Sequence, residues 1–130
     1  MSLMPASDPW LPLWLAVAGA VGVLSRWGLG ELAAGARAVS PMAATVGVNT
    51  LGCLAFGYVA AVLPAQHPLR VPLLVGLLGG FTTYATFAAQ THALLGQGRW
   101  GTAWVQLTAQ CLLGVLAVWL GSRVACWLRV

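Results

Sequence analysis

The sequence predicts an all-α membrane protein with four transmembrane helices, of which the third is broken. Of its 130 residues, 60% are hydrophobic and only 6% are charged, whereas a soluble domain has about 25% charged residues. The apolar stretches are long enough to cross a hydrocarbon layer about 30 Å thick. The third stretch, Leu69 to Leu95, has glycines, threonines and aromatic residues at its centre, which is unusual for a helix surrounded by lipid. We expect one four-span domain, residues 1–130.

Composition also excludes some classes of protein. The net charge is +4, but the basic residues are six scattered arginines, so no basic cluster is available to bind nucleic acid. The three cysteines lie in apolar stretches without a metal-ligand or redox spacing, and we interpret them as packing residues. Neither His67 nor His92 has a ligand-type partner nearby in the sequence, and no nucleophile–base pair indicates an enzyme.

The first expected span covers residues 11–34. Trp10 and Trp14 at its start are typical of a membrane interface. Arg26 lies within the apolar stretch, where it either snorkels to the headgroups or bonds nearby carbonyls, or faces a partner or a watery vestibule. We favour a structural charge. Glu31 follows and either pairs with a neighbouring arginine or is solvated.

The second expected span, residues 42–63, carries Thr45 and Asn49 on one face because they are four residues apart. An asparagine at this depth is destabilising unless it is hydrogen-bonded. Two roles are equally consistent with the sequence. Asn49 joins two helices, or its NH2 group donates into a pore.

The third expected span, residues 70–95, begins near Pro72, whose missing N–H matters least in the first turn of a helix. The adjacent Gly79 and Gly80 predict a break in this helix. After the break, one face carries Tyr84 and Phe87, and another carries Thr83, Thr86 and Gln90. Non-helical backbone at membrane depth has to be buried in protein or line a watery cavity, so this stretch predicts a polar path or an ion site.

The fourth expected span, residues 101–126, follows a tight turn. Thr102, Gln106 and Gln110 recur every four residues along it. They form a polar stripe that must face protein or water.

The arginines divide equally between the two sides of a four-span chain. One side has Arg70, Arg123 and Arg129, and the other has Arg26, Arg37 and Arg99. An excess of basic residues on one side normally sets the orientation, so this chain has no preferred orientation. We hypothesise that it inserts both ways up and forms an antiparallel, dual-topology homodimer.

Three motifs, in order and over nearly the whole chain, resemble the CrcB/Fluc family of fluoride channels. They are a glycine-rich run ending in Arg26-Trp27, the T-x-x-x-N-x-x-G pattern of Thr45 to Gly52, and the stretch GGFTTYATF from Gly79 to Phe87. The resemblance implies a fluoride-selective channel that exports fluoride passively from the cytoplasm and lowers its toxicity. It also implies an antiparallel homodimer with two pores and a central sodium ion, in a prokaryotic plasma (inner) membrane.

The same resemblance implies separate roles for the motif residues. The fluoride path would be lined by Asn49, Tyr84, Thr86 and Phe87. The backbone carbonyls of Gly79 and Thr82 would hold the structural sodium ion. Three residues depart from the family pattern: Tyr84 for the usual Phe, Ala85 for Ser, and Gln90 for a common acidic residue. These departures bear on conductance and selectivity, and a paired homologous subunit in place of a second identical copy stays open.

A small proton-coupled multidrug exporter is the alternative. Such proteins also have four spans and can dimerise antiparallel, but they need a membrane-embedded carboxylate. Glu31 is the only candidate, and it lies at the shallow end of the first span. A third class, a non-transporting assembly subunit or membrane anchor, would not require the polar and aromatic motif of the third span.

Overall fold

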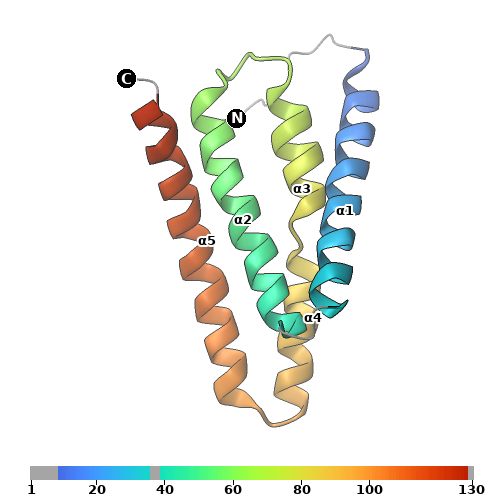
Figure 1. The fold of residues 1–130 in the computed structure, drawn as a ribbon, viewed down its shortest axis with the longest axis vertical. Helices are drawn as coiled ribbons and strands as arrows, with labels where there is room; N and C mark the ends of the chain where they lie inside the picture. Colours follow the sequence, from blue (N-terminus) through green and yellow to red (C-terminus); the bar gives the residue numbers. More distant parts are fainter. Residues whose placement is uncertain (1–8, 36–38, 129–130) are drawn as a thin grey trace.

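The described part of the chain forms four helical spans and contains no strand (Figure 1). The computed structural model describes residues 9–35 and 39–128, so Asp8, Arg37 and Arg129 lie outside the described residues. Three spans are continuous helices: α1 (Leu11–Gly35), α2 (Pro41–Val62) and α5 (Trp100–Leu128). The other is divided into η1 (Pro72–Leu78), a π-helical segment, α3 (Gly79–Phe81) and α4 (Tyr84–Gly96). The predicted all-α class with a broken third helix is confirmed.

The four spans are long and apolar enough to cross a membrane. Their bounds differ from the expected ones by at most two residues, as at the start of the third span, expected at residue 70 and found at Pro72. Helix α2 begins one residue earlier than expected because Ser40 caps it. The Ser40 hydroxyl accepts a hydrogen bond of 3.2 Å from the Ala43 N–H, and Pro41 occupies the first helical position, where its lack of an N–H is harmless.

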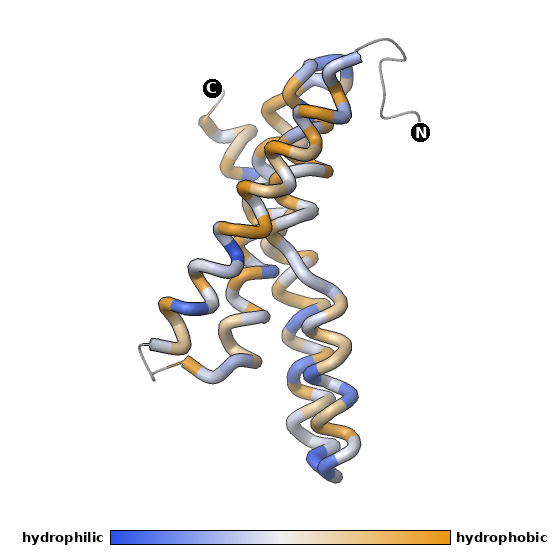
Figure 2. The backbone as a smooth tube through the Cα atoms, turned by 90° about the vertical axis from the view of Figure 1, so that its right-hand side faces the viewer, coloured by the Kyte–Doolittle hydropathy of each residue, from blue (hydrophilic) through white to orange (hydrophobic). Residues whose placement is uncertain are grey.

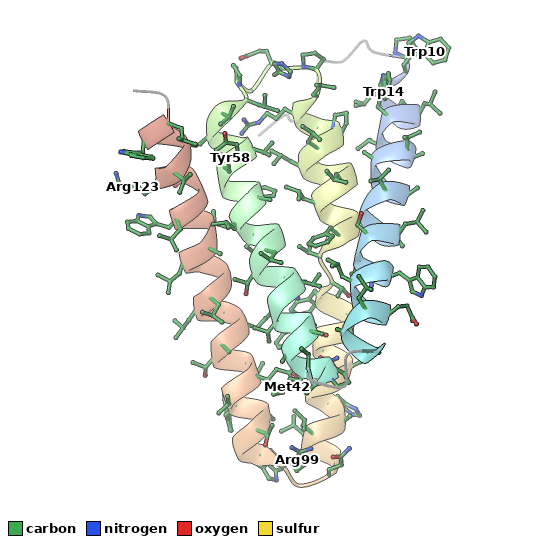
Figure 3. All side chains as sticks on the ribbon, in the orientation of Figure 1. Trp10, Trp14, Met42, Tyr58, Arg99 and Arg123 are labelled. Carbon is green, nitrogen blue, oxygen red and sulfur yellow. The ribbon has the colours of Figure 1, made fainter. Side chains whose placement is uncertain are left out.

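The chain runs up and down, so alternate connections lie at the same end of the bundle. Trp10, Trp14, Tyr58 and Arg123 lie at one end, and Met42 and Arg99 at the other (Figure 3). Trp10, Trp14 and Tyr58 are exposed at 64%, 53% and 37%, as expected for side chains at a membrane interface.

Close helix packing depends on glycines at two interfaces. A Cβ atom at Gly22 of α1 would overlap the Leu77 carbonyl oxygen of η1. A Cβ atom at Gly57 of α2 would overlap the Val118 carbonyl oxygen of α5. Because these two glycines lack a side chain, the backbones of the paired helices approach one another closely, as is common in membrane bundles.

Two helix pairs separate toward the lower end of the molecule. Figure 2 shows the end of α1 and the start of α2 on one side and the hairpin of α4 and α5 on the other. Arg70, in the connection at the opposite end, bonds the end of α2 through its Nη1, which donates to the carbonyls of Ala60 (2.9 Å) and Leu63. Arg70 therefore fixes the upper connection to the end of α2, while the two helix pairs diverge at the lower end.

Candidate functional site

The third span is interrupted at Thr82 and Thr83, not at the two glycines. Gly79 is helical, with φ −64° and ψ −38°, whereas Thr82 (φ −83°, ψ 156°) and Thr83 (φ −145°, ψ 108°) are extended. The expectation that Gly79 and Gly80 themselves break the helix is therefore wrong. Gly80 is required for packing instead, because a Cβ atom there would lie 2.7 Å from the Gly19 carbonyl oxygen.

The threonine side chains satisfy the helix ends at the interruption. The Thr82 hydroxyl donates to the Leu78 carbonyl at 2.9 Å. The Thr83 hydroxyl accepts from the Thr86 N–H at 3.2 Å and thereby caps the N-terminus of α4. Threonine is a favoured residue at this capping position. Two consecutive threonines thus end one helix and start the next within the membrane span.

Asn49 of α2 holds the interruption through a pair of hydrogen bonds to one residue. Its Nδ2 donates to the Thr83 carbonyl at 3.0 Å, and its Oδ1 accepts from the Thr83 N–H at 2.7 Å. The asparagine is buried, with 5% of its surface exposed. Of the two roles left open by the sequence, the structure shows the interhelical one. One N–H of its NH2 group remains for a further acceptor, since an amide NH2 has two donors.

The interruption leaves several backbone carbonyls without their helical donors, and those of Gly79 and Thr82 are among them. In a continuous helix the Gly79 carbonyl would bond the Thr83 N–H, and the Thr82 carbonyl would bond the Thr86 N–H. Here the Thr83 N–H donates to Asn49 and the Thr86 N–H donates to the Thr83 hydroxyl. These are the two carbonyls that the family resemblance implied as sodium ligands.

Arg26 bonds the backbone just before the interruption. Its Nε donates to the Gly80 carbonyl at 3.3 Å. This carbonyl would otherwise bond the Tyr84 N–H, which lies beyond the break. The arginine therefore connects α1 to the broken span, and it also lines a cavity described below.

The aromatic residues that follow the interruption differ in exposure. The rings of Tyr84 and Phe87 meet edge to face, with centroids 5.5 Å apart and an angle of 65° between their planes. Phe87 is 4% exposed, whereas Tyr84 is 78% exposed. The hydroxyl of Thr86, also on the outside of α4, lies 2.9 Å from the Thr83 hydroxyl. Hydroxyls and an aromatic edge are thus presented on the outside of a single chain.

A cavity of about 310 Å³ opens between α1, α2 and the interruption. It is lined by polar and charged residues together with small apolar ones. The polar and charged members are Arg26, Glu31, Thr45, Thr83, Thr86 and Gln90. Arginine, hydroxyl and amide groups facing a cavity at this depth are typical of an ion pathway rather than of packed lipid-facing helices.

A second set of polar contacts links α2, α4 and α5. The Gln90 Nε2 donates to the Thr45 hydroxyl at 2.9 Å, and the Gln106 Nε2 donates to the Gln90 Oε1 at 3.0 Å. Gln106 is 1% exposed, so this part of the polar stripe on α5 faces protein. The spacing of the stripe predicted that it faces protein or water, but nothing in the sequence identified Gln90 as the partner of Gln106.

The cysteines and histidines do not join the site. Cys53, Cys111 and Cys126 are free thiols. The ring Nδ1 of His67 accepts from the Leu69 N–H at 3.2 Å, which stabilises the turn between α2 and η1. Within residues 9–35 and 39–128, no cluster of three or more His, Cys, Asp or Glu side chains is placed to hold a metal ion.

Comparison with known proteins identifies the family. The family model described as "CrcB-like protein, Camphor Resistance (CrcB)" matches residues 13–122. A protein of Nitratidesulfovibrio vulgaris named fluoride-specific ion channel FluC is 43% identical, over 82% of this chain and 90% of its own length. A protein of Symbiobacterium thermophilum named fluoride-specific ion channel FluC 2 is 37% identical, over 89% and 98%. With its four spans, the chain is a multi-pass membrane protein, and it belongs to the CrcB-like family.

Proposed function

We propose that this protein is a fluoride-selective ion channel that lets fluoride leave the cytoplasm passively and so lowers its toxicity. The relatives named as fluoride-specific channels support this function. The observation that carries the proposal is the interruption inside the third span, held by Asn49 and surrounded by hydroxyls, an aromatic pair and an arginine-lined cavity. No chemical reaction is required, because an ion that moves down its gradient needs only a selective path.

The fluoride path would be formed by Asn49, Thr86, Tyr84 and Phe87. Fluoride is small and strongly hydrated, so a pore must replace its water with other donors. The second N–H of Asn49 and the hydroxyl of Thr86 are such donors. The edge of an aromatic ring carries partial positive charge, and the ring of Tyr84, which packs edge to face with Phe87 and is 78% exposed, is accessible to an anion.

A structural sodium ion fits the carbonyls of Gly79 and Thr82. Sodium is a small hard cation that prefers oxygen ligands, as broken membrane helices supply elsewhere. The hydrogen bonds of Asn49 and Thr83 divert the N–H groups that would otherwise occupy these two carbonyls. The ion would supply a fixed positive charge beside the anion path, and its bonds to backbone oxygens would stabilise the interruption.

An antiparallel homodimer would complete the site. Tyr84 is 78% exposed and Thr86 lies on the surface of the single chain, and polar groups at membrane depth need protein or water around them. A second copy would provide this cover. The described arginines are balanced as dual insertion requires. Arg70, between α2 and η1, and Arg123, near the end of α5, belong to one side of the four-span topology, whereas Arg26, in the second half of α1, and Arg99, between α4 and α5, belong to the other. A paired homologous subunit would satisfy the same need, and the expected location is a prokaryotic plasma membrane.

Ion efflux from liposomes tests the proposal. Vesicles that contain the purified protein would be loaded with fluoride, chloride or a cationic dye. We expect fluoride release on dissipation of the membrane potential, with chloride and dye retained. Proton-driven movement of the dye without fluoride release would instead support the multidrug exporter, and release of none of the three would support a non-transporting subunit.

A further inference from the structure

The side chain of Gln90 separates two cavities at the lower end of the bundle. One is the cavity of about 310 Å³ that contains Arg26 and Thr45. The other, of about 500 Å³, lies between α2, α4 and α5 and contains Arg99 and Gln106. Gln90 lines both. Its carboxamide has a donor end and an acceptor end, so the direction in which it points determines which polarity each cavity meets.

A chain of hydrogen bonds from Pro41 to Gln106 fixes the direction of the Gln90 amide. The Pro41 carbonyl, which can only accept, receives the Thr45 hydroxyl at 3.0 Å and the Gln90 Nε2 at 3.3 Å. Thr45 has then used its proton, so its oxygen accepts the other N–H of Gln90 at 2.9 Å. The Oε1 of Gln90 is left facing α5, where the Gln106 Nε2 donates to it at 3.0 Å.

The arrangement leaves one buried acceptor unsatisfied. Among the described residues, the Gln106 Oε1 has no hydrogen-bond partner, although Gln106 is 1% exposed. A buried unpaired oxygen is destabilising, and such groups are rare enough to require an explanation. Rotating the Gln106 amide by 180° would not remove the unsatisfied acceptor, because the oxygens of Gln90 and Gln106 would then face each other without a donor between them.

We propose that Gln106 is a positioning residue for fluoride entry, an inference that rests on the proposed channel function. By donating to Gln90, it keeps the NH2 end of Gln90 toward the cavity that contains Arg26. In this orientation the acceptors at that wall, Pro41 and Thr45, are both covered by donors. The reverse orientation would present the Gln90 oxygen beside the Pro41 carbonyl, and the wall would repel an anion. The long 3.3 Å bond is the one that an entering anion would displace.

A double-mutant cycle tests this role. Methionine matches glutamine in length but cannot donate, so the variants are Gln106→Met, Gln90→Met and the double mutant, with fluoride efflux measured at increasing fluoride concentrations. We expect Gln106→Met to raise the half-saturating fluoride concentration by about fivefold to tenfold, the range for loss of one hydrogen bond, with little change in thermal unfolding. Once Gln90 has no amide to orient, removing Gln106 should have no additional effect, so the double mutant should resemble Gln90→Met.

The controls separate this inference from the proposed function. Gln97→Met, at an exposed position beside the second cavity, should leave the half-saturating concentration unchanged. Additive effects in the cycle, or a Gln106→Met variant that is only less stable, would show that Gln106 merely packs. A wild-type protein that releases no fluoride would overturn the channel function and this inference together, whereas normal fluoride release with an unchanged Gln106→Met variant overturns the inference alone.

Discussion

Asn49 and Thr83 exchange two hydrogen bonds, of 3.0 and 2.7 Å, across the break in the third span. The amide side chain thereby replaces the backbone partners that an extended residue loses inside a membrane helix. Non-helical backbone is tolerated at that depth because one side chain satisfies both the N–H and the C=O of Thr83. The pair joins two sequence motifs, holds the break in the third span and lies on the proposed ion path.

Replacing Asn49 with aspartate is expected to abolish fluoride efflux. The carboxylate can still accept from the Thr83 N–H, but it faces the Thr83 carbonyl without a donor and adds negative charge to the path. Asn49→Ala loses both bonds and should lower the free energy of unfolding by about 1–3 kcal/mol. Efflux assays and thermal unfolding measure the two effects, and undiminished fluoride flux in Asn49→Asp would rule out a pore role for this residue.

Thr83 is expected to stabilise α4 through its hydroxyl. Thr83→Val keeps the shape but removes the acceptor for the Thr86 N–H, and should lower the free energy of unfolding by about 1 kcal/mol, the usual value of such a cap. Thr83→Ser keeps the hydroxyl and serves as the matched control. Equal unfolding midpoints for the two variants would contradict the capping role.

Gly57 is expected to tolerate no side chain. Gly57→Ala places a methyl group against the Val118 carbonyl, and should destabilise the protein by about 1–3 kcal/mol as overpacking does. Gly47→Ala, on the same helix but with open space around its position, should be neutral or slightly stabilising, by up to about 1 kcal/mol. Thermal unfolding in detergent compares them, and a reversed order would disprove the close approach of α2 and α5.

Removal of sodium is expected to lower thermal stability. If the carbonyls of Gly79 and Thr82 hold the ion, sodium at about one hundred times its dissociation constant stabilises the folded state by about 2.7 kcal/mol. Unfolding would be followed in sodium salt and in potassium salt of equal ionic strength, which keeps screening constant. The same unfolding temperature in both salts over a wide concentration range would argue against a bound sodium ion.

Glu31 distinguishes the channel from the proton-coupled exporter. The residue is exposed and lines the rim of the cavity with Arg26. Glu31→Gln should leave most of the fluoride efflux intact, because a passive channel needs no proton carrier, whereas an exporter would lose exchange. Dye export that depends on Glu31 would reverse the assignment.

Much of the fold could be predicted from local patterns in the sequence. The four spans were predicted from the length and apolar composition of the stretches and from the position of Pro72. These features depend only on neighbouring residues and on the thickness of the bilayer. The motif residues around the interruption were grouped by the family resemblance and not by local pattern. The location of the break was not predicted, because a glycine pair can serve either as a hinge or as a contact surface. Gly19, across the interface from Gly80, decides between these roles.

The sequence by itself determined that this protein is an α-helical membrane protein with a polar, broken third span. Only the tertiary structure decided that Asn49 bonds Thr83, that the Gly79 and Thr82 carbonyls lose their helical donors, and that Gln106 donates to Gln90. The physical reason is that a hydrogen bond is directional and short. Spacing along a helix shows which face a side chain occupies, but the partner comes from another helix whose position depends on packing throughout the bundle.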